Sequence, residues 1–276
     1  MHVYFHLFGL NIPAYGTMIA TGVLLANLIA YFLIKRDGKT FDDLLLVEAY
    51  AILGGFVGAK LLYILVSIPS IDFRRLGDLS YVNDLIRGGF VFYGGLIGGV
   101  LGILIGKKIH HYDVAYFAKR IVFLVPFCHA FGRIGCFMAG CCYGVEYHGP
   151  CHVVFPEDSF AIPGVPLFPI QMVEAICLFL ISLLLFILMV KFHSRFTVEI
   201  YIAVYACLRF VLEKYRFDAD RGIYFGLSTS QWISILLLTG AAVSVIVRKR
   251  RLASVPAVEP VKEEADNEEP KEEDPA

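Results

Sequence analysis

Long apolar runs alternate with short polar segments along most of the chain. About 20 consecutive apolar residues are enough for a helix to cross the hydrocarbon core of a bilayer. By that criterion the pattern predicts about seven transmembrane helices, although glycines interrupt the third and charged residues the sixth. The predicted spans are residues 15–35, 44–68, 90–106, 117–139, 169–190, 198–214 and 230–247. We therefore expect an all-α, polytopic membrane protein.

The composition agrees with that class. Of the 276 residues, 58% are hydrophobic and only 18% are charged, whereas soluble domains carry about a quarter of charged residues. The first residues lack the basic stretch of a cleavable signal peptide, so we expect the first apolar run to remain as a helix. Membrane lipids are expected around the helices, and no nucleic-acid partner is expected.

Lysine and arginine are distributed unevenly among the predicted loops. They follow the first, third and fifth spans and the end of the seventh, whereas residues 141–168 contain none. By the positive-inside rule, the N-terminus lies outside and the C-terminus in the cytoplasm, which requires an odd number of spans. Arg74, Arg75 and Arg87 are exceptions, which we interpret as solvated loop charges or phosphate contacts at the headgroup level.

The composition changes abruptly near the C-terminus. The segment 252–276 is rich in Glu, Asp, Lys and Pro, which predicts a disordered acidic cytoplasmic tail after a transmembrane domain of residues 1–251. The basic cluster 248–251 between them is expected to anchor the last span at anionic lipids.

Arg133 is the most informative residue, because it follows an apolar run. A cation at mid-bilayer costs roughly 3 kcal/mol or more, so such a residue usually faces a cavity and a partner. We expect Arg133 to contact an anion. His129 lies four residues earlier and so shares a helix face with it. An imidazole beside a guanidinium tends to remain neutral, which suits a proton acceptor; the alternative is a hydrogen bond to a neighbouring helix.

A second polar stripe lies in the sixth predicted span. Its members, which follow helical spacing, are Tyr205, Arg209, Glu213 and Arg216. Glu213 is spaced to pair with Arg209 or Arg216, so a purely structural ion-pair ladder is one interpretation. The other is that Arg133 and Arg209 together hold a phosphate, because two planar guanidinium forks suit bidentate capture. The abundant phosphate of a membrane belongs to its phospholipids.

These blocks resemble the prolipoprotein diacylglyceryl transferase family of bacteria. The resemblance rests on Gly132-Arg-Ile-Gly-Cys-Phe-Met-Ala-Gly-Cys-Cys-Tyr-Gly144, on Tyr15-Gly16 and Tyr93-Gly-Gly-Leu-Ile-Gly, on Gln171 with Glu174, and on the Tyr205 stripe. It covers about residues 10–245 and implies seven spans with the same orientation, in the bacterial cytoplasmic membrane.

The resemblance implies an activity and a set of site residues. Members transfer a diacylglyceryl group from phosphatidylglycerol to the lipobox cysteine thiol of a preprolipoprotein, which forms a thioether, releases glycerol phosphate and begins lipoprotein maturation. No cofactor or metal is implied. The catalytic residues would be Arg133, Arg209 and Tyr93, to which His129 is added on helix geometry alone. The substrate-binding residues would be Tyr15, Arg133, Gly144, Tyr205, Arg209, Glu213 and Arg216.

The chain departs from the family pattern at several positions. Tyr93 replaces a histidine regarded as catalytically important, and Cys136, Ala139 and Cys141 replace two asparagines and a glutamate. Since tyrosine is a poor base at neutral pH, we hypothesise that His129 takes over proton abstraction.

Four cysteines cluster near the outer end of the fourth span, with His148 and His152. They are Cys136, Cys141, Cys142 and Cys151. Three interpretations stay open: a disulfide or structural packing, a soft-metal or redox site, and direct participation in catalysis.

Two other function classes also stay open. One is a non-enzymatic or transport-type protein that binds an anionic lipid on the same scaffold. The other is a transferase that uses a different thiol acceptor.

Overall fold

The structure is a computed structural model that describes residues 3–7, 9–75, 77–217 and 222–253. Helices dominate these residues, as predicted. The long helices are α1 (Ala14–Arg36), α2 (Asp42–Ser67), α4 (Phe92–His110), α6 (Leu124–Ala139), α7 (Ile170–Val190), α8 (Thr197–Leu212) and α9 (Thr229–Ala253). Shorter elements are α3 (Leu79–Arg87), α5 (Val114–Ile121) and the 3-10 helices η1 (Ile68–Ser70), η2 (Phe73–Arg75) and η3 (Glu213–Tyr215).

The protein is a polytopic helical membrane protein. Within the described residues, five helices are long and apolar enough to cross a membrane, and the bent α5–α6 pair brings the number to six. Helix α8 occupies the sixth predicted span, but its 16 residues are fewer than a full crossing needs. The count of seven and the orientation therefore stay predictions.

The fourth predicted span is not one straight helix. The chain bends by 59° between α5 and α6, and the break lies just before Pro126. Proline has no N–H to donate to the Val122 carbonyl in a continuous helix. The Val125 N–H takes that acceptor instead, at 3.1 Å, and α6 starts afresh with Pro126 in its first turn, where no N–H is required.

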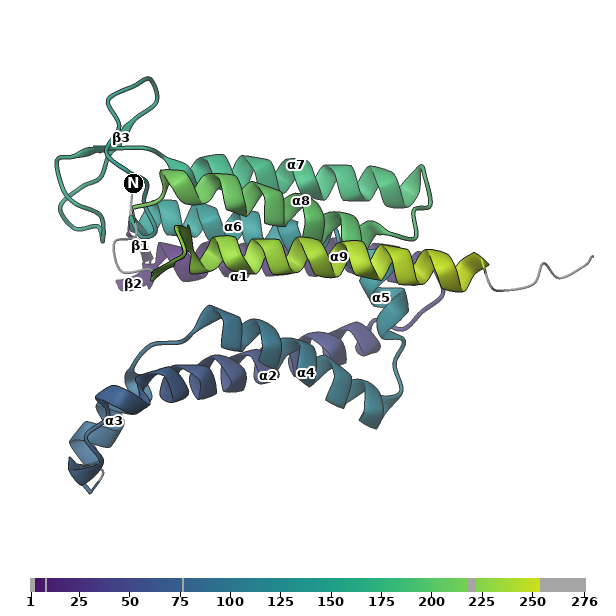
Figure 1. The fold of residues 1–276 in the computed structure, drawn as a ribbon, viewed down its shortest axis with the longest axis horizontal. Coiled ribbons are helices and arrows are strands. Elements are labelled where there is room, and N and C mark those ends of the chain that lie inside the picture. The colour runs from purple at the N-terminus through teal and green to yellow at the C-terminus, as the bar shows by residue number, and fades with distance from the viewer. Residues whose placement is uncertain (1–2, 8, 76, 218–221, 254–276) are drawn as a thin grey trace, which may run out of the picture.

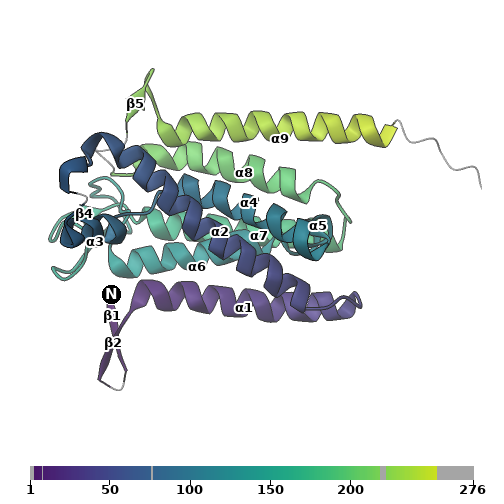
Figure 2. The ribbon, with the colours of Figure 1, turned by 90° about the horizontal axis from the view of Figure 1, so that it is seen from below.

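The helices form a bundle and a separate arm. Contacts link α1 to α6, α6 to α7, α7 to α8 and α8 to α9, and Figure 2 shows this order across the bundle. Helices α2 and α4 pack on each other and form the arm below the bundle in Figure 1. At one end, Asn27 of α1 donates to Glu48 of α2 at 3.1 Å, and Arg120 of α5 pairs with Asp37 at 2.7 Å.

Among the described residues, three short pairs of strands lie at the other end of the molecule, where α1 begins and α6 ends (Figure 1). They are β1 (Tyr4–Leu7) with β2 (Leu10–Pro13), β3 (Val153–Val154) with β4 (Pro166–Leu167), and β5 (Ile223–Tyr224) with β6 (Leu227–Ser228), all antiparallel. The hydropathy pattern did not predict them. This end, called the outer end below, is the one predicted to lie outside.

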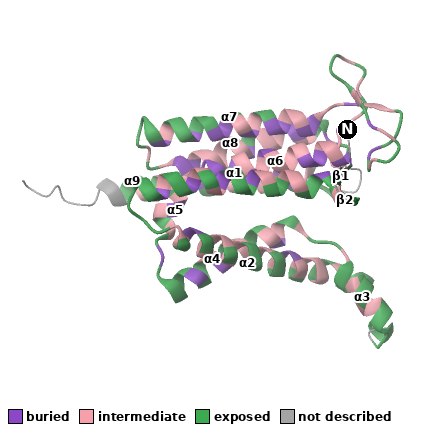
Figure 3. Cartoon of the chain, turned by 180° about the vertical axis from the view of Figure 1, so that it is seen from behind, coloured by how far each residue is buried: buried purple, intermediate pink, exposed green. Residues whose placement is uncertain are grey.

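The buried residues lie mainly in the bundle and not in the arm (Figure 3). Leu178 and Leu185 of α7 are fully buried, and Gln171 and Glu174 of the same helix are almost as well buried. Leucine and phenylalanine side chains of α2 and α4, such as Leu53, Phe56 and Leu101, are exposed. Such an apolar surface suits lipid rather than water. The predicted acidic tail, except Leu252 and Ala253 at the end of α9, lies outside the described residues.

Glycines allow the two arm helices to approach closely. A Cβ atom on Gly98 would collide with the Gly54 carbonyl oxygen and the Gly58 backbone, whereas one on Gly95 would make ordinary contacts at 3.5 Å. Gly98 and Gly95 lie on the same helix, three residues apart. Small residues at such interfaces let membrane helices pack without a hydrophobic driving force.

We predict that Gly98→Ala destabilises the arm by about 1–3 kcal/mol, the usual cost of overpacking. Gly95→Ala is the matched control, and its unfolding free energy should stay near that of the wild type. Denaturant unfolding in detergent micelles measures both variants. Equal stability of Gly98→Ala and Gly95→Ala would contradict the close glycine interface.

Candidate anion-binding site

The first arginine singled out in the sequence is paired inside the bundle. Arg133 of α6 contacts Glu174 of α7, with 3.1 Å between its Nη2 and the carboxylate Oε1. The Glu174 side chain is 1% exposed and that of Arg133 is 13% exposed. The pair supplies the compensation that a cation in this environment needs, and it joins α6 to α7.

The second arginine has an equivalent pair. Arg209 of α8 contacts Glu213 in η3 at 2.6 Å, so the predicted i,i+4 pairing is confirmed. Arg209 also donates to the Ser230 hydroxyl at 3.3 Å, and the Ser228 hydroxyl donates to Glu213 at 2.8 Å. These bonds fasten α8 and η3 to the start of α9.

An aromatic side chain lies between the two pairs. Tyr205 of α8 interacts electrostatically with Arg133, Arg209 and Glu174, and its hydroxyl is within hydrogen-bonding reach of Arg133. The His129 ring packs edge-on against the Tyr205 ring at 5.4 Å between centroids. His129 thus lies beside both guanidiniums. Helical rise puts it about 10 Å before Cys136 along α6, further from the outer end.

Two donors in this region have no hydrogen-bond partner within the described part of the chain. They are Nε of Arg133 and Nη1 of Arg209, both buried. Buried polar groups are nearly always satisfied, so two open guanidinium donors indicate a site that accepts an anion. Arg133, Arg209 and the buried Arg216 face the two carboxylates of Glu174 and Glu213, which leaves an excess of one positive charge.

The loop after α6 is held against the rest of the site. Gly144 forms an isolated antiparallel bridge with Arg216, and the Val145 N–H donates to the Tyr215 carbonyl at 3.0 Å. A Cβ atom on Gly144 would lie 2.5 Å from the Phe168 carbonyl oxygen. Gly144 is therefore required by close backbone packing, and this packing sets the position of Arg216.

Three of the four clustered cysteines come together. The sulfur atoms of Cys136, Cys141 and Cys142 lie within 4.8 Å of one another, and all three are free thiols. Cys151, although near in sequence, lies on an exposed loop and is not part of this group. Hydrogen bonds from the Cys136 and Cys141 thiols, and then the charges of Arg216 and Arg133, lower the pKa of the Cys142 thiol.

Tyr15 and Tyr93 have different positions. Tyr15, at the start of α1, interacts electrostatically with the three thiols and with Arg133, and α1 packs there against Gly135 of α6. Tyr93 lies at the start of α4, in the arm, and its ring packs against Phe92 at 5.7 Å. The structure therefore brings Tyr15 toward the arginines but leaves Tyr93 on a different body.

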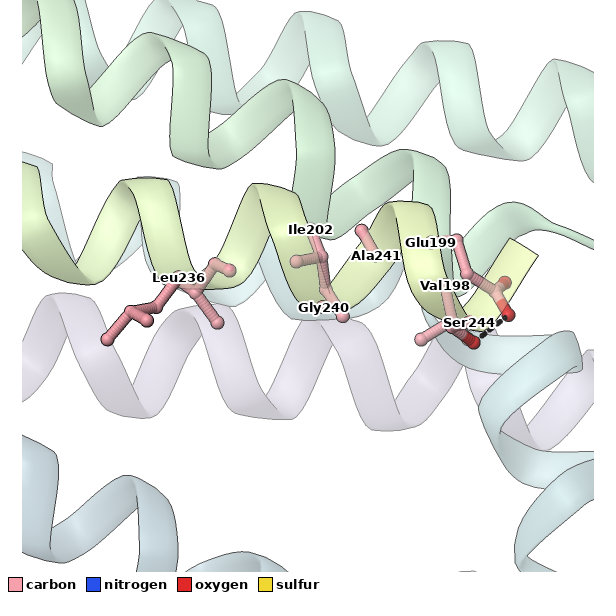
Figure 4. Close-up of a pocket in the computed structure, with 8 residues that line it drawn as sticks. Val198, Glu199, Ile202, Leu236, Gly240, Ala241 and Ser244 are labelled. Atoms are coloured by element: carbon pink, nitrogen blue, oxygen red, sulfur yellow. Dashed lines mark hydrogen bonds between the residues drawn. The ribbon is translucent and has the colours of Figure 1, made fainter. Parts of the chain in front are cut away.

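A shallow hollow between α8 and α9 is separate from this site (Figure 4). Its lining is mostly apolar, with Ile202, Leu236 and Gly240 among its residues. The Ser244 hydroxyl donates to Glu199 at 3.0 Å at one end of the hollow, and Arg248 also pairs with Glu199. These bonds fix the far end of α9.

Several groups that complete the site have no predicted role. They are Glu174, Gln171, Ser228 and Ser230. Gln171 donates to the Cys141 carbonyl at 2.9 Å and so ties α7 to the cysteine loop. Glu174 and Gln171 could have been singled out from the sequence, because they place an acid and an amide in α7, the most apolar of the long helices. Polar groups in a membrane span usually face a partner.

The long apolar helices define a polytopic membrane protein. The buried guanidinium–carboxylate pairs with open donors form its candidate anion-binding site. The chain matches the model of the prolipoprotein diacylglyceryl transferase family over residues 2–247. It belongs to that family and is a transferase.

Relatives with related names support this assignment. A protein of Clostridium perfringens named phosphatidylglycerol–prolipoprotein diacylglyceryl transferase 2 is 36% identical over 250 residues, covering 88% of this chain and 93% of the relative. The transferase of Clostridium tetani is 37% identical over 251 residues, covering 90% and 98%. That of Clostridioides difficile is 30% identical over 252 residues, covering 90% and 96%.

We predict that Glu174→Gln lowers the unfolding free energy by about 3–5 kcal/mol, because it leaves the buried Arg133 charge uncompensated. The double variant Arg133→Gln, Glu174→Gln should recover most of that loss. Unfolding in detergent micelles measures the cycle.

The control is Glu146→Gln, which breaks an exposed pair with His148 at 2.9 Å and should change stability by less than about 0.5 kcal/mol. A Glu174→Gln effect as small as that of the control would contradict the buried pair.

Proposed function

We propose that this protein transfers the diacylglyceryl group of phosphatidylglycerol to the lipobox cysteine thiol of preprolipoproteins, at the bacterial cytoplasmic membrane. The reaction forms a thioether, releases glycerol phosphate and is the first step of lipoprotein maturation. The observation that carries this proposal is the pair of buried guanidiniums with open donors at Arg133 and Arg209.

The charge of the site fits the lipid. Arg133, Arg209 and Arg216 exceed Glu174 and Glu213 by one positive charge, and a phosphodiester such as that of phosphatidylglycerol carries one negative charge. Glycerol phosphate leaves with a second negative charge. Oriented donors at a developing charge stabilise the transition state more than the ground state, and removal of one such donor typically costs about 10²–10³ in rate.

The positions of the other predicted substrate-binding residues support their assignment to the same site. Tyr205 interacts electrostatically with Arg133, Arg209 and Glu174, and Tyr15 interacts with Arg133 and the thiols. Glu213 orients Arg209, and Gly144 supports Arg216 through the backbone bridge. We assign Tyr15 and Tyr205 to the lipid headgroup and Glu213, Gly144 and Arg216 to positioning. We assign no role to Tyr93, which lies in α4 of the arm, so its predicted catalytic role stays a prediction.

The role of His129 as general base remains a prediction. His129→Gln tests it by mass spectrometry of a lipobox peptide incubated with purified enzyme and phosphatidylglycerol. Loss of a general base costs about 10²–10⁴ in rate, so a fall of that size would support the role. Unchanged transfer would show that another group deprotonates the substrate thiol.

We predict that Arg133→Lys and Arg209→Lys each lower diacylglyceryl transfer by about 100-fold or more. Lysine keeps the charge but loses the planar fork that holds a phosphate through two hydrogen bonds. The same lipobox assay measures the loss, and complementation of a strain lacking the transferase extends it to cells.

Arg120→Lys is the control, because Arg120 pairs with Asp37 at the opposite end of the bundle. Its transfer rate should stay near that of the wild type. Correctly folded wild-type protein that binds phosphatidylglycerol without forming the thioether would contradict the transferase and favour a lipid-binding protein.

A further inference from the structure

The three thiols after α6 form a constellation that the phosphate site does not use. Cys136 lies in the last turn of α6, and Gly140 (φ 75°) and Cys142 (φ 57°) adopt left-handed conformations that turn the chain back. This turn directs the sulfur atoms of Cys141 and Cys142 toward Cys136, all within 4.8 Å. The Gln171 bond to the Cys141 carbonyl holds the turn against α7.

The spacing of these sulfur atoms suits zinc. Zinc–thiolate bonds of about 2.3 Å in a tetrahedron put the sulfur atoms about 3.8 Å apart. The group therefore needs to contract by about 1 Å at most. Three protein ligands with one open position are typical of catalytic rather than structural zinc sites.

Exposure and charge agree with an open fourth position. Cys136 is buried, whereas Cys141 and Cys142 are partly exposed, so a fourth ligand can approach from their side. Three thiolates and one zinc ion carry one net negative charge. Arg133 and Arg216 interact electrostatically with Cys142 and so reduce the repulsion among the thiolates.

We propose that Cys136, Cys141 and Cys142 bind a zinc ion whose open position takes the thiol of the substrate lipobox cysteine. This inference rests on the proposed transferase activity and deepens it. It provides an ionised nucleophile at the outer end of α6, next to Arg133.

The step balances without an oxidant or a reductant. The substrate thiol binds zinc and releases its proton to water, a step that replaces proton abstraction by His129. The resulting thiolate attacks the glyceryl carbon that carries the phosphate, so an S–C bond forms and the C–O bond breaks. The electron pair of that bond leaves on glycerol phosphate, whose second negative charge faces Arg133 and Arg209. Zinc remains bound to the three cysteines.

Metal binding is tested first, on the full chain in detergent. The reduced protein is freed of metal with a chelator, given Zn²⁺ alone, and analysed for metal content and by X-ray absorption. We expect one zinc per chain with sulfur neighbours at about 2.3 Å. The double variant Cys136→Ser, Cys141→Ser should lose this zinc, and the exposed control Cys151→Ser should keep it.

Three outcomes would overturn the site. They are no zinc in the reduced wild type, zinc without sulfur neighbours, and a disulfide among these cysteines in protein isolated from membranes. Zinc is also removed from the wild type and added back. This repeats the binding test without a substitution, so the result does not depend on whether a variant folds.

Activity tests the role of the metal. A free thiol of pKa about 8.5 is only a few per cent ionised at pH 7, whereas a zinc-bound thiol is deprotonated. Metal-free protein should therefore transfer about 30-fold more slowly at pH 7 and recover on addition of zinc. Its deficit should shrink as the pH rises toward 9, which a purely structural metal would not cause.

The two proposals fail differently. Equal transfer with and without zinc would overturn the zinc proposal and leave the transferase intact. No transfer by zinc-loaded, folded protein would overturn the transferase itself.

Discussion

The structure of the bundle depends on keeping two guanidinium groups inside an apolar protein. A buried charge is tolerated only when a partner of opposite charge and further hydrogen bonds compensate its lost hydration. Arg133 satisfies this through Glu174 on the neighbouring helix α7. Arg209 satisfies it through Glu213 on its own helical turn and Ser230 on α9. Both requirements act at the outer end, so α6, α7, α8 and α9 have to converge there.

The carboxylates position the arginines without neutralising them completely. A guanidinium has five donors in a rigid fork, and one carboxylate leaves some of them open. Nε of Arg133 and Nη1 of Arg209 are such donors. Glu174 and Glu213 therefore act as rigid supports that aim the remaining donors and reduce the cost of burial. A single anionic lipid phosphate, which brings one more negative charge, completes the balance.

The helices could be predicted from the sequence because their apolar runs are long. Arg133 and Arg209 could be predicted as site residues because they interrupt those runs. The bend before α6 could not, since Pro126 lies within an apolar run and only the missing N–H reveals the break. Glu174 belongs to one of the blocks that resemble the family, but its partner Arg133 depends on how α6 and α7 pack. Spacing within one helix did predict the Arg209–Glu213 pair, because i,i+4 contacts need no tertiary information.

The positions of Tyr93 and of the cysteines both bear on which group activates the substrate thiol. Tyr93 belongs to the α2–α4 arm, whereas the arginines belong to the bundle (Figure 1). Tyrosine also has little to offer as a base at neutral pH. Cys136, Cys141 and Cys142 lie in the bundle with the arginines, and α6 itself carries both Arg133 and Cys136. On the zinc proposal, activation of the substrate thiol moves from the arm to the bundle. The zinc ligand Cys136 and the phosphate contact Arg133 then lie on one rigid helix, which favours the fixed geometry that a displacement at carbon requires.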